Sequence, residues 1–383
     1  MSTLSEYQQL ILPTMMMNKV LSIWPLDQNN SSMVENRLRI VHRTLVFLIL
    51  TSYSIAVTAD FIHHRKDIAD ATECALIGIA FYLSVVRIVI YTVHQDKLTY
   101  IVKTMKTDWE KSNLKDREIL KDKCIFVFKL SKYFIFTVIS TILAFMFIPL
   151  LESVLLGTNE RKLPFRGYFY DNQTNYPAYG YLYIYSITSG GLGGCTIAGA
   201  TSLNLIMVMH GAAKFKVVRK RLEALKSEAD NKEEFKECVI QHQSAILFAE
   251  RVEGTINILA LGQFLISSGL LCFAGVQITM VEQAKGDLMK YSSFLNSAIF
   301  ELFLFSYSGN ELMSESEAIG MSIYKSDWIG ADFMKSLRII IMRSFIPSTI
   351  TAGKFYNMSL MSFTSVLSTA FSYFTVLQTM HSE

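Results

Sequence analysis

Near the end of the chain, polar side chains repeat with a spacing that can line a path for water and ions. Ser365, Thr369, Ser372, Val376 and Thr379 are separated by 4, 3, 4 and 3 residues, so they share one face of a helix. Hydroxyl oxygens on such a face can solvate cations, and the aliphatic Val376 interrupts them. The spacing alone leaves an alternative open, in which the hydroxyls bond back to the preceding turn or join helices within lipid.

This face belongs to a chain with the composition of a membrane protein. Of its 383 residues 51% are hydrophobic and 18% are charged, against about 25% charged in soluble proteins. The mean hydropathy is +0.31, and the apolar residues stand in long blocks. The formal charge of +3 gives no indication of nucleic acid binding. The first 38 residues lack an apolar core followed by a small-residue cleavage site, so we expect the N-terminus to be retained.

The apolar blocks predict an all-α membrane protein with seven transmembrane helices, since each span needs about 20 apolar residues. Two predicted spans contain an interior charge, Arg87 and Glu301, which we expect to be buried against other helices. A shorter apolar stretch at 337–347 carries two arginines and ends in proline, which predicts a half-helix at the inner boundary. The predicted spans are 40–60, 71–93, 133–152, 179–210, 256–280, 291–310 and 355–380.

The distribution of positive charge predicts the orientation of these spans. The N-terminal segment and the second, fourth and sixth loops hold 26 Lys and Arg residues, and the other loops and the C-terminal tail hold 7. Because positive loops stay in the cytoplasm, we predict a cytoplasmic N-terminus and an extracellular C-terminus. Asn172, in an Asn-Gln-Thr sequon of the third loop, would then lie outside and be open to glycosylation.

The same pattern divides the chain into four regions. In the fourth loop, apolar residues recur near helical spacing, which predicts helices that pack in a compact intracellular bundle. The third loop concentrates Pro, Gly and Tyr and predicts a lid or interfacial segment. The regions are a cytoplasmic N-terminal segment at 1–39, spans one to six at 40–310 with cytosolic helical extensions at 94–132 and 213–255, a cytosolic loop and half-helix anchor at 311–354, and the last span with a short tail at 355–383.

Motifs for catalysis, metal binding or cofactor binding are absent from the sequence. It contains no His-Glu-x-x-His, no P-loop, no Cys-x-x-Cys and no Gly-x-Ser-x-Gly at a strand-to-helix junction. His63 and His64 have no third ligand at metal-binding spacing. The glycine-rich stretch at 189–200 lies in an uncharged span and predicts close helix approach. We therefore expect no enzyme, no cofactor and no metal, and the remaining classes are receptor, channel and transporter.

The C-terminal stretch resembles the signature of insect odorant receptors. In that family a Gly-Lys-Phe-Tyr sequence, here 353–356, precedes a Ser-, Leu- and Phe-rich helix with a Ser-Tyr-Phe triplet, here 372–374. The resemblance continues over nearly the whole chain and is most specific in its final third. Its other matching positions are Ile23-Trp24-Pro25, His242, Gly309, Asn310, Glu311, Ser316, Tyr324 and Trp328.

The resemblance implies a heterotetrameric, ligand-gated cation channel in the plasma membrane of a sensory neuron dendrite. An odorant-specific subunit would assemble with a shared co-receptor subunit, bind a small volatile organic ligand and pass cations. The region 213–255 is shorter than its counterpart in the co-receptor, so this chain resembles the odorant-specific subunit. In such channels the last helix of each subunit lines the pore, and alignment of the Ser-Tyr-Phe triplet places the gate at Val376. Lipid surrounds the assembly.

The resemblance also implies a mainly apolar ligand site in the outer half of the bundle, between the second, third, fourth and sixth spans. Each candidate position on these spans also fits ordinary helix packing. The candidates are Phe81, Tyr82, Leu143, Phe147, Tyr183, Ile187, Phe294 and Ser297.

Two alternative functions remain open at this point. Gustatory receptors end in a related pattern with Thr-Tyr before Gln-Phe, of which Ser372-Tyr373 and Gln378-Thr379 are an imperfect version. A metabotropic seven-helix receptor would need the N-terminus outside, and the sequence has none of the Asp-Arg-Tyr or Asn-Pro-x-x-Tyr motifs of that class.

Overall fold

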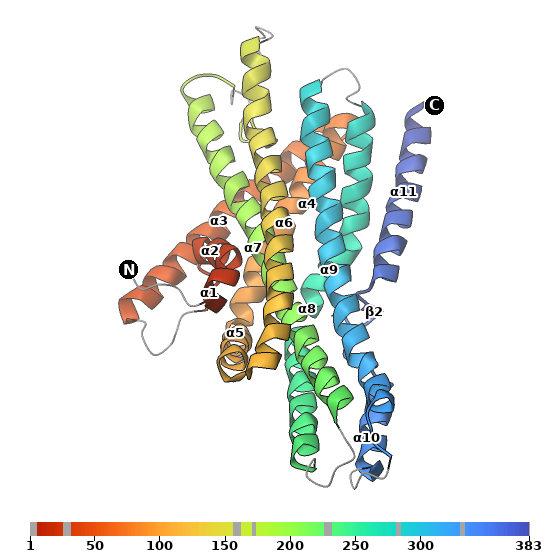
Figure 1. Ribbon diagram of the computed structural model, residues 1–383. Helices are drawn as coiled ribbons and strands as arrows, with labels where there is room; N and C mark the ends of the chain where they lie inside the picture. Colours follow the sequence, from red (N-terminus) through yellow and green to blue (C-terminus); the bar gives the residue numbers. More distant parts are fainter. Residues whose placement is uncertain are drawn as a thin grey trace.

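The apolar blocks of the sequence become long helices that lie side by side (Figure 1). The computed structural model describes residues 6–25, 32–155, 162–170, 174–225, 232–280, 285–329 and 334–382. Its helices are α1 (Glu6–Leu10), α2 (Leu12–Val20), α3 (Met33–His64), α4 (Ile68–Val93), α5 (Gln95–Lys111), α6 (Leu114–Leu155), α7 (Ala178–Ala224), α8 (Lys232–Met280), α9 (Lys285–Lys325), α10 (Met334–Ser344) and α11 (Leu360–Ser382). Strands β1 (Thr351–Ala352) and β2 (Tyr356–Asn357) form a short antiparallel hairpin.

Six of the described helices are long and apolar enough to cross a membrane: α3, α4, α6, α7, α8 and α11. The remaining predicted span, the sixth at 291–310, corresponds to α9, which packs along α7 and contains the interior carboxylate of Glu301. α7 and α8 continue well beyond the predicted spans, to Ala224 and from Lys232. They pack with α9, and the end of α9 packs with α10 at the lower end of the bundle in Figure 1.

α7 lies at the centre of the bundle because its small residues let other helices come close. A Cβ atom on Gly190 would lie 2.0 Å from the ring of Phe165, and one on Gly194 would lie 2.0 Å from the Cδ1 atom of Ile142. Contacts this short are impossible for real side chains, so only glycine allows these two neighbours to sit where they do. The close helix approach predicted for the glycine-rich stretch is therefore present.

A buried ion pair connects four helices near the middle of the bundle. The Nη2 atom of Arg87 on α4 lies 2.7 Å from the Oε1 atom of Glu301 on α9 and also donates to Gln263 on α8. Thr201 on α7 donates to the same carboxylate oxygen at 2.6 Å. Arg87 and Glu301 are both buried, as expected for charges within predicted spans. Each charge is hydrogen-bonded, which offsets the cost of removing it from water.

The last helix begins at Leu360, five residues later than predicted. Gly353 and Lys354 adopt positive φ angles of 57° and 68°, which turn the chain into the β1-β2 hairpin. Lys354 forms an ion pair with Glu253 of α8 and so holds the hairpin against the bundle. Ser359 then caps α11, accepting a hydrogen bond from the Ser362 amide at 3.3 Å.

Candidate ligand cavity and exposed helix face

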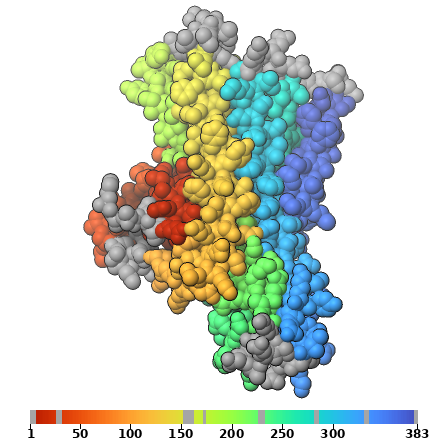
Figure 2. Space-filling view, in the orientation of Figure 1, coloured from red at the N-terminus to blue at the C-terminus, as the bar shows by residue number. Residues whose placement is uncertain are grey.

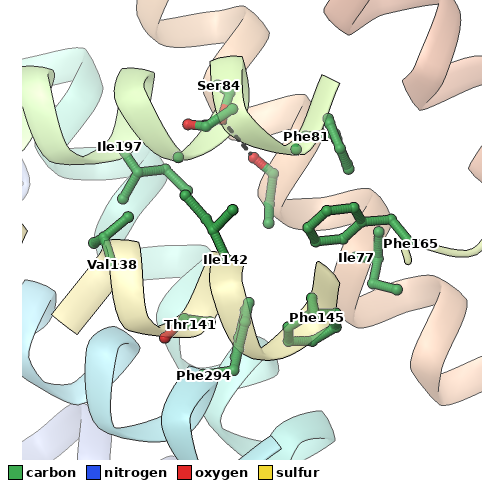
Figure 3. Close-up of a pocket in the computed structure, with 14 residues that line it drawn as sticks. Ile77, Phe81, Ser84, Val138, Thr141, Ile142, Phe145, Phe165, Ile197 and Phe294 are labelled. Atoms are coloured by element: carbon green, nitrogen blue, oxygen red, sulfur yellow. Dashed lines mark hydrogen bonds between the residues drawn. The ribbon is translucent and has the colours of Figure 1, made fainter. Parts of the chain in front are cut away.

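A small apolar cavity lies between α4, α6, α7 and α9 in the half of the bundle that contains the 162–170 segment (Figure 3). Its volume is about 90 Å³, several times the roughly 10–15 Å³ that one water needs. The cavity therefore has room for roughly six to nine non-hydrogen atoms. Its lining residues are Ile77, Ala80, Phe81, Ser84, Val138, Thr141, Ile142, Phe145, Phe165, Gly190, Gly193, Gly194, Ile197 and Phe294.

The roof of the cavity comes from the segment between α6 and α7, which the sequence predicts as a lid. Phe165 stacks on Phe145 with ring centroids 5.2 Å apart, and its carbonyl accepts a hydrogen bond of 2.7 Å from the hydroxyl of Tyr53. The next residue, Arg166, forms ion pairs with Asp60 and Asp70. The hydrogen bond from Arg166 lowers the pKa of the Asp70 carboxyl below its usual value. These contacts fix the roof to the ends of α3 and α4.

Two hydroxyl groups interrupt the apolar wall, and both already donate their protons. Ser84 donates to the carbonyl of Ala80 at 2.9 Å. Thr141 donates to the carbonyl of Thr137 at 3.0 Å, and its oxygen also lies 2.9 Å from the hydroxyl of Ser297. A ligand would therefore be held mainly by dispersion and hydrophobic contact, with hydroxyl oxygens as the nearest polar partners.

The predicted ligand residues fall into two groups relative to this cavity. Phe81 and Phe294 line it, and Ser297 stands directly behind Thr141. Tyr82, Leu143 and Phe147 are exposed on the outside of the bundle, with 46%, 44% and 51% of their surface accessible. Tyr183 and Ile187 are outside the lining as well, and the hydroxyl of Tyr183 donates to the carbonyl of Met146 at 2.6 Å. Ligand contact remains a prediction for all eight residues.

The ion pair of Arg87 and Glu301 lies below the cavity floor. On α4, Ser84 lines the cavity and Arg87 follows three residues later; on α7, Thr201 follows the lining residue Ile197 by four. Positions three or four residues apart share a helix face one turn further along. The polar network is therefore about one turn deeper than the cavity wall and connects the same helices.

α11 packs against its own chain on one side only. Val366 and Ala370 are buried against Leu271 of α8 and Leu302 of α9. The face predicted to line a pore is turned away from this contact, and Val376 on it is 57% exposed. Of the other predicted pore residues, Ser365, Ser372 and Thr379 are exposed and Thr369 is half-buried. Figure 2 shows α11 in blue along one edge of the molecule.

The hydroxyls of this face donate to their own helix. Thr369 donates to the carbonyl of Ser365, and Ser372 to that of Ser368, both at 2.9 Å. This is the back-bonding that the sequence left open as an alternative. It uses the hydroxyl proton and leaves oxygen lone pairs directed outward, so both interpretations of the stripe fit the geometry.

Two further predictions concern modification and metal binding. Asn172, the predicted glycosylation site, lies outside the described residues. Among the described residues, no group of three or more His, Cys, Asp or Glu side chains is arranged to hold a metal ion.

Long apolar helices packed around a small apolar cavity indicate a multi-pass membrane protein. The chain belongs to the 7tm odorant receptor family, whose profile matches residues 67–371. This confirms the resemblance found in the sequence and favours an odorant receptor over the gustatory and metabotropic alternatives. Members of this family are receptors and not enzymes.

Individual relatives agree with this assignment. The chain is 25% identical to odorant receptor 13a of Drosophila melanogaster over 94% of its own length and 92% of that protein. It is 26% identical to odorant receptor 10 of Aedes albopictus, covering 58% of this chain and 61% of that one. Both proteins are named as odorant receptors.

Solved structures confirm the fold. The olfactory receptor OR5 from Machilis hrabei in complex with eugenol superimposes with a TM-score of 0.85 over 98% of this chain and all of that chain, at 16% identity. A second structure of OR5 gives a TM-score of 0.79 over 97% of this chain and 99% of that chain, also at 16% identity. The predicted all-α, seven-span membrane fold is therefore correct.

Proposed function

We propose that this chain is the odorant-binding subunit of a ligand-gated, non-selective cation channel in the plasma membrane of a sensory neuron dendrite. One observation carries the proposal: the same chain combines an apolar cavity with a helix that leaves a hydroxyl-bearing face uncovered. The cavity supplies a place for a volatile ligand, and the uncovered face supplies a wall for a shared pore. The N-terminus is cytoplasmic and the C-terminus extracellular, with Asn172 on the outside.

The ligand is a small, mainly apolar volatile molecule. About 90 Å³ of space suits roughly six to nine non-hydrogen atoms. Even at about 1 kcal/mol for each atom, such a ligand binds at roughly micromolar strength. This is sufficient for gating, because the ligand need favour the open state over the closed state by only a few kcal/mol.

The pore is formed by α11 of each subunit in a heterotetramer with a co-receptor. A path of direct contacts joins the cavity to this helix: Phe294 lines the cavity on α9, and Leu302 on the same helix packs against Val366 of α11. Ligand in the cavity shifts α9, α11 moves with it, and Val376 leaves the pore axis. Cations then pass along Ser365, Thr369, Ser372 and Thr379.

Assembly uses the lower end of the bundle. Ile339 on α10 is 70% exposed, and Phe345 and Ile346 just after it are exposed as well. Apolar side chains this open suit a contact with another subunit, whereas pore helices in lipid gain little from hydrophobic burial. The segment 334–346 is therefore the main intersubunit anchor.

The decisive experiment fills the cavity. In cells that also express a co-receptor, Phe294→Trp should abolish odorant-evoked currents while surface expression is retained, because the larger ring occupies the ligand volume. Leu143→Trp is the matched control, since Leu143 is a predicted ligand residue that faces outward from α6. If Leu143→Trp abolished the odorant-evoked current and Phe294→Trp left it intact, the cavity would not be the ligand site. Antibody access to a tag on each terminus of intact cells tests the orientation and separates this proposal from a metabotropic receptor.

A further inference from the structure

A second and larger hollow lies on the side of the bundle, between α1, α2 and α5, which lie together in Figure 1. We call it the interfacial groove. Its volume is about 420 Å³, more than four times that of the ligand cavity. Its walls include Tyr7, Ile11 and Met15 on one side and Val102 on the other. The volume and the apolar walls exceed what a small volatile ligand needs.

The interfacial groove lies at the depth of the inner membrane boundary. The side chain of Asn18 on α2 donates to the carbonyl of Gly199 on α7 at 2.9 Å, which fixes α2 at that level. The 21 helical steps from Ala178 at the start of α7 to Gly199 rise about 31 Å at 1.5 Å per step, close to the roughly 30 Å thickness of the hydrocarbon core. With the orientation of the proposed function, on which this inference rests, the groove opens at the cytoplasmic leaflet.

A tryptophan at the groove supports this depth. Trp24 lines the groove together with Pro25, and Arg39 of α3 donates to the carbonyls of Trp24 and Ser22. Indole rings favour the headgroup level of membranes, where one edge is apolar and the other is wet. The aromatic ring and the apolar walls together suit the upper part of a lipid acyl chain.

The polar rim of the groove carries more positive than negative charge. Lys19 on α2 and Lys103 and Lys106 on α5 line it, against a single carboxylate from Glu110. None of these three lysines forms an ion pair with a carboxylate in the part of the chain that the structure describes. By contrast, Lys121 close by is paired with Glu6 at 2.6 Å. The rim therefore presents positive charge that its own neighbours do not neutralise.

We propose that the interfacial groove binds an anionic phospholipid of the cytoplasmic leaflet. The headgroup phosphate lies among Lys19, Lys103 and Lys106, and an acyl chain follows the apolar wall beside Trp24. A zwitterionic lipid would place its own cation among the same lysines and bind less well. The bound lipid bridges α2 and α5, two elements that are separate in the sequence, at the point where the bundle leaves the membrane.

The test uses the full chain in lipid nanodiscs and reads the fluorescence of Trp24. Trp109→Phe and Trp328→Phe leave Trp24 as the single tryptophan. At equal mole fraction, phosphatidylserine with brominated acyl chains should quench Trp24 several-fold more than brominated phosphatidylcholine, since each lysine near a membrane surface favours an anionic lipid about five-fold. The two lipids should quench Trp24 equally in the triple variant, which combines Lys19→Gln, Lys103→Gln and Lys106→Gln. The single variant Lys103→Gln should lower the ratio of the two quenching efficiencies only partly.

The matched control removes the same number of charges elsewhere. Lys115, Lys129 and Lys232 are exposed and lie outside the groove, so their combined change to Gln should leave the preference intact. Equal loss in both triple variants would show only diffuse attraction and overturn the proposal. In the protein with all three rim lysines present, the two brominated lipids could also quench Trp24 equally while inorganic phosphate changes its emission. That result would show a site for a free anion and would overturn the proposal too. The readout needs no odorant, current or co-receptor, so its failure is distinct from failure of the proposed function.

Discussion

α7 and α11 are both long enough to cross a membrane, yet they relate to their own chain in opposite ways. In its most apolar stretch α7 is 83% buried inside the molecule, and α11 is 17% buried. α7 achieves this through glycines such as Gly190 and Gly194, which accept neighbouring side chains at contact distance. α11 has one packing face, around Val366, and leaves the rest open. α7 is therefore buried almost entirely by its own chain, whereas most of the surface of α11 is open to contacts outside it.

The side chains of the open face bear on the proposed pore. α3 is also partly open, and its exposed side chains include Leu45, Leu48 and Ile55, which suit lipid tails. The open face of α11 instead carries Ser365 and Ser372 beside a few apolar residues. On α3 the exposed Ser52 donates to the carbonyl of Leu48 at 2.7 Å, so its own backbone satisfies that hydroxyl. The row of hydroxyls on α11 is longer, and in the proposed channel water and neighbouring subunits are its partners.

The largest expected effect comes from breaking the network that holds the central helices together. Arg87→Met removes the partner of Glu301 and leaves a carboxylate buried among α4, α7, α8 and α9. Losing one member of a buried pair costs about 3–5 kcal/mol. We therefore expect little folded receptor, measured as the monodisperse fraction and melting temperature of the solubilised protein.

A second variant separates the charge from the packing. Arg87→Met combined with Glu301→Leu should recover much of the folded fraction, because two apolar groups replace the pair. The exposed Arg37 serves as the control, since Arg37→Met should change little. If the Arg87→Met protein were as stable as the Arg37→Met control, the ion pair of Arg87 and Glu301 would not be what holds α7 in its buried position.

The next effect concerns two adjacent glycines on α7. Gly190→Ala places a methyl group 2.0 Å from the ring of Phe165, whereas Gly191→Ala meets nothing within 4 Å. Overpacking typically costs about 1–3 kcal/mol, and the Phe165 ring must move from the cavity roof. We expect Gly190→Ala to raise the odorant concentration for half-maximal current about ten-fold and Gly191→Ala to leave it unchanged. Equal responses in both variants would remove Phe165 from the ligand site.

The sequence predicted the helices and their charges better than it predicted the cavity wall. The seven spans, Arg87 and Glu301 follow from hydropathy and from the cost of charge in lipid, which depend on local sequence. The wall depends on how far each helix is rotated about its axis. On α6 the lining positions Val138, Thr141, Ile142 and Phe145 share one face, and the predicted Leu143 and Phe147 lie on another.

Two features of the sequence bear on that rotation. Thr141 is a polar residue within an apolar span, and polar residues in spans turn toward protein, so it could have marked the inward face. Phe165 offered no such signal, because it reaches the cavity from a loop whose path is set by Arg166 and the carboxylates of α3 and α4. Similarly, Gly353 and Lys354 turn the chain before α11, where hydropathy alone extended the span to residue 355.

The smallest expected change in stability comes from the same substitution, valine to alanine, made at two positions of α11. Comparing the two variants is also the most direct test of which side of α11 packs against its own chain. Val366 is 3% exposed in the packing face and Val376 is 57% exposed on the hydroxyl face. Val366→Ala removes contacts with Leu271 and Leu302, so it should lower the free energy of unfolding by about 1 kcal/mol. Val376→Ala should change it by less than about 0.5 kcal/mol.

Channel recordings should show the reverse order. Val376→Ala shortens the one aliphatic side chain in the hydroxyl stripe, so current without odorant should rise and the relative permeability of cations should change. Val366 is instead buried against α8 and α9, so Val366→Ala should leave both unchanged at matched surface expression. If Val376→Ala altered neither resting current, selectivity nor block, α11 would face lipid there as α3 does, and its hydroxyls would serve only its own backbone.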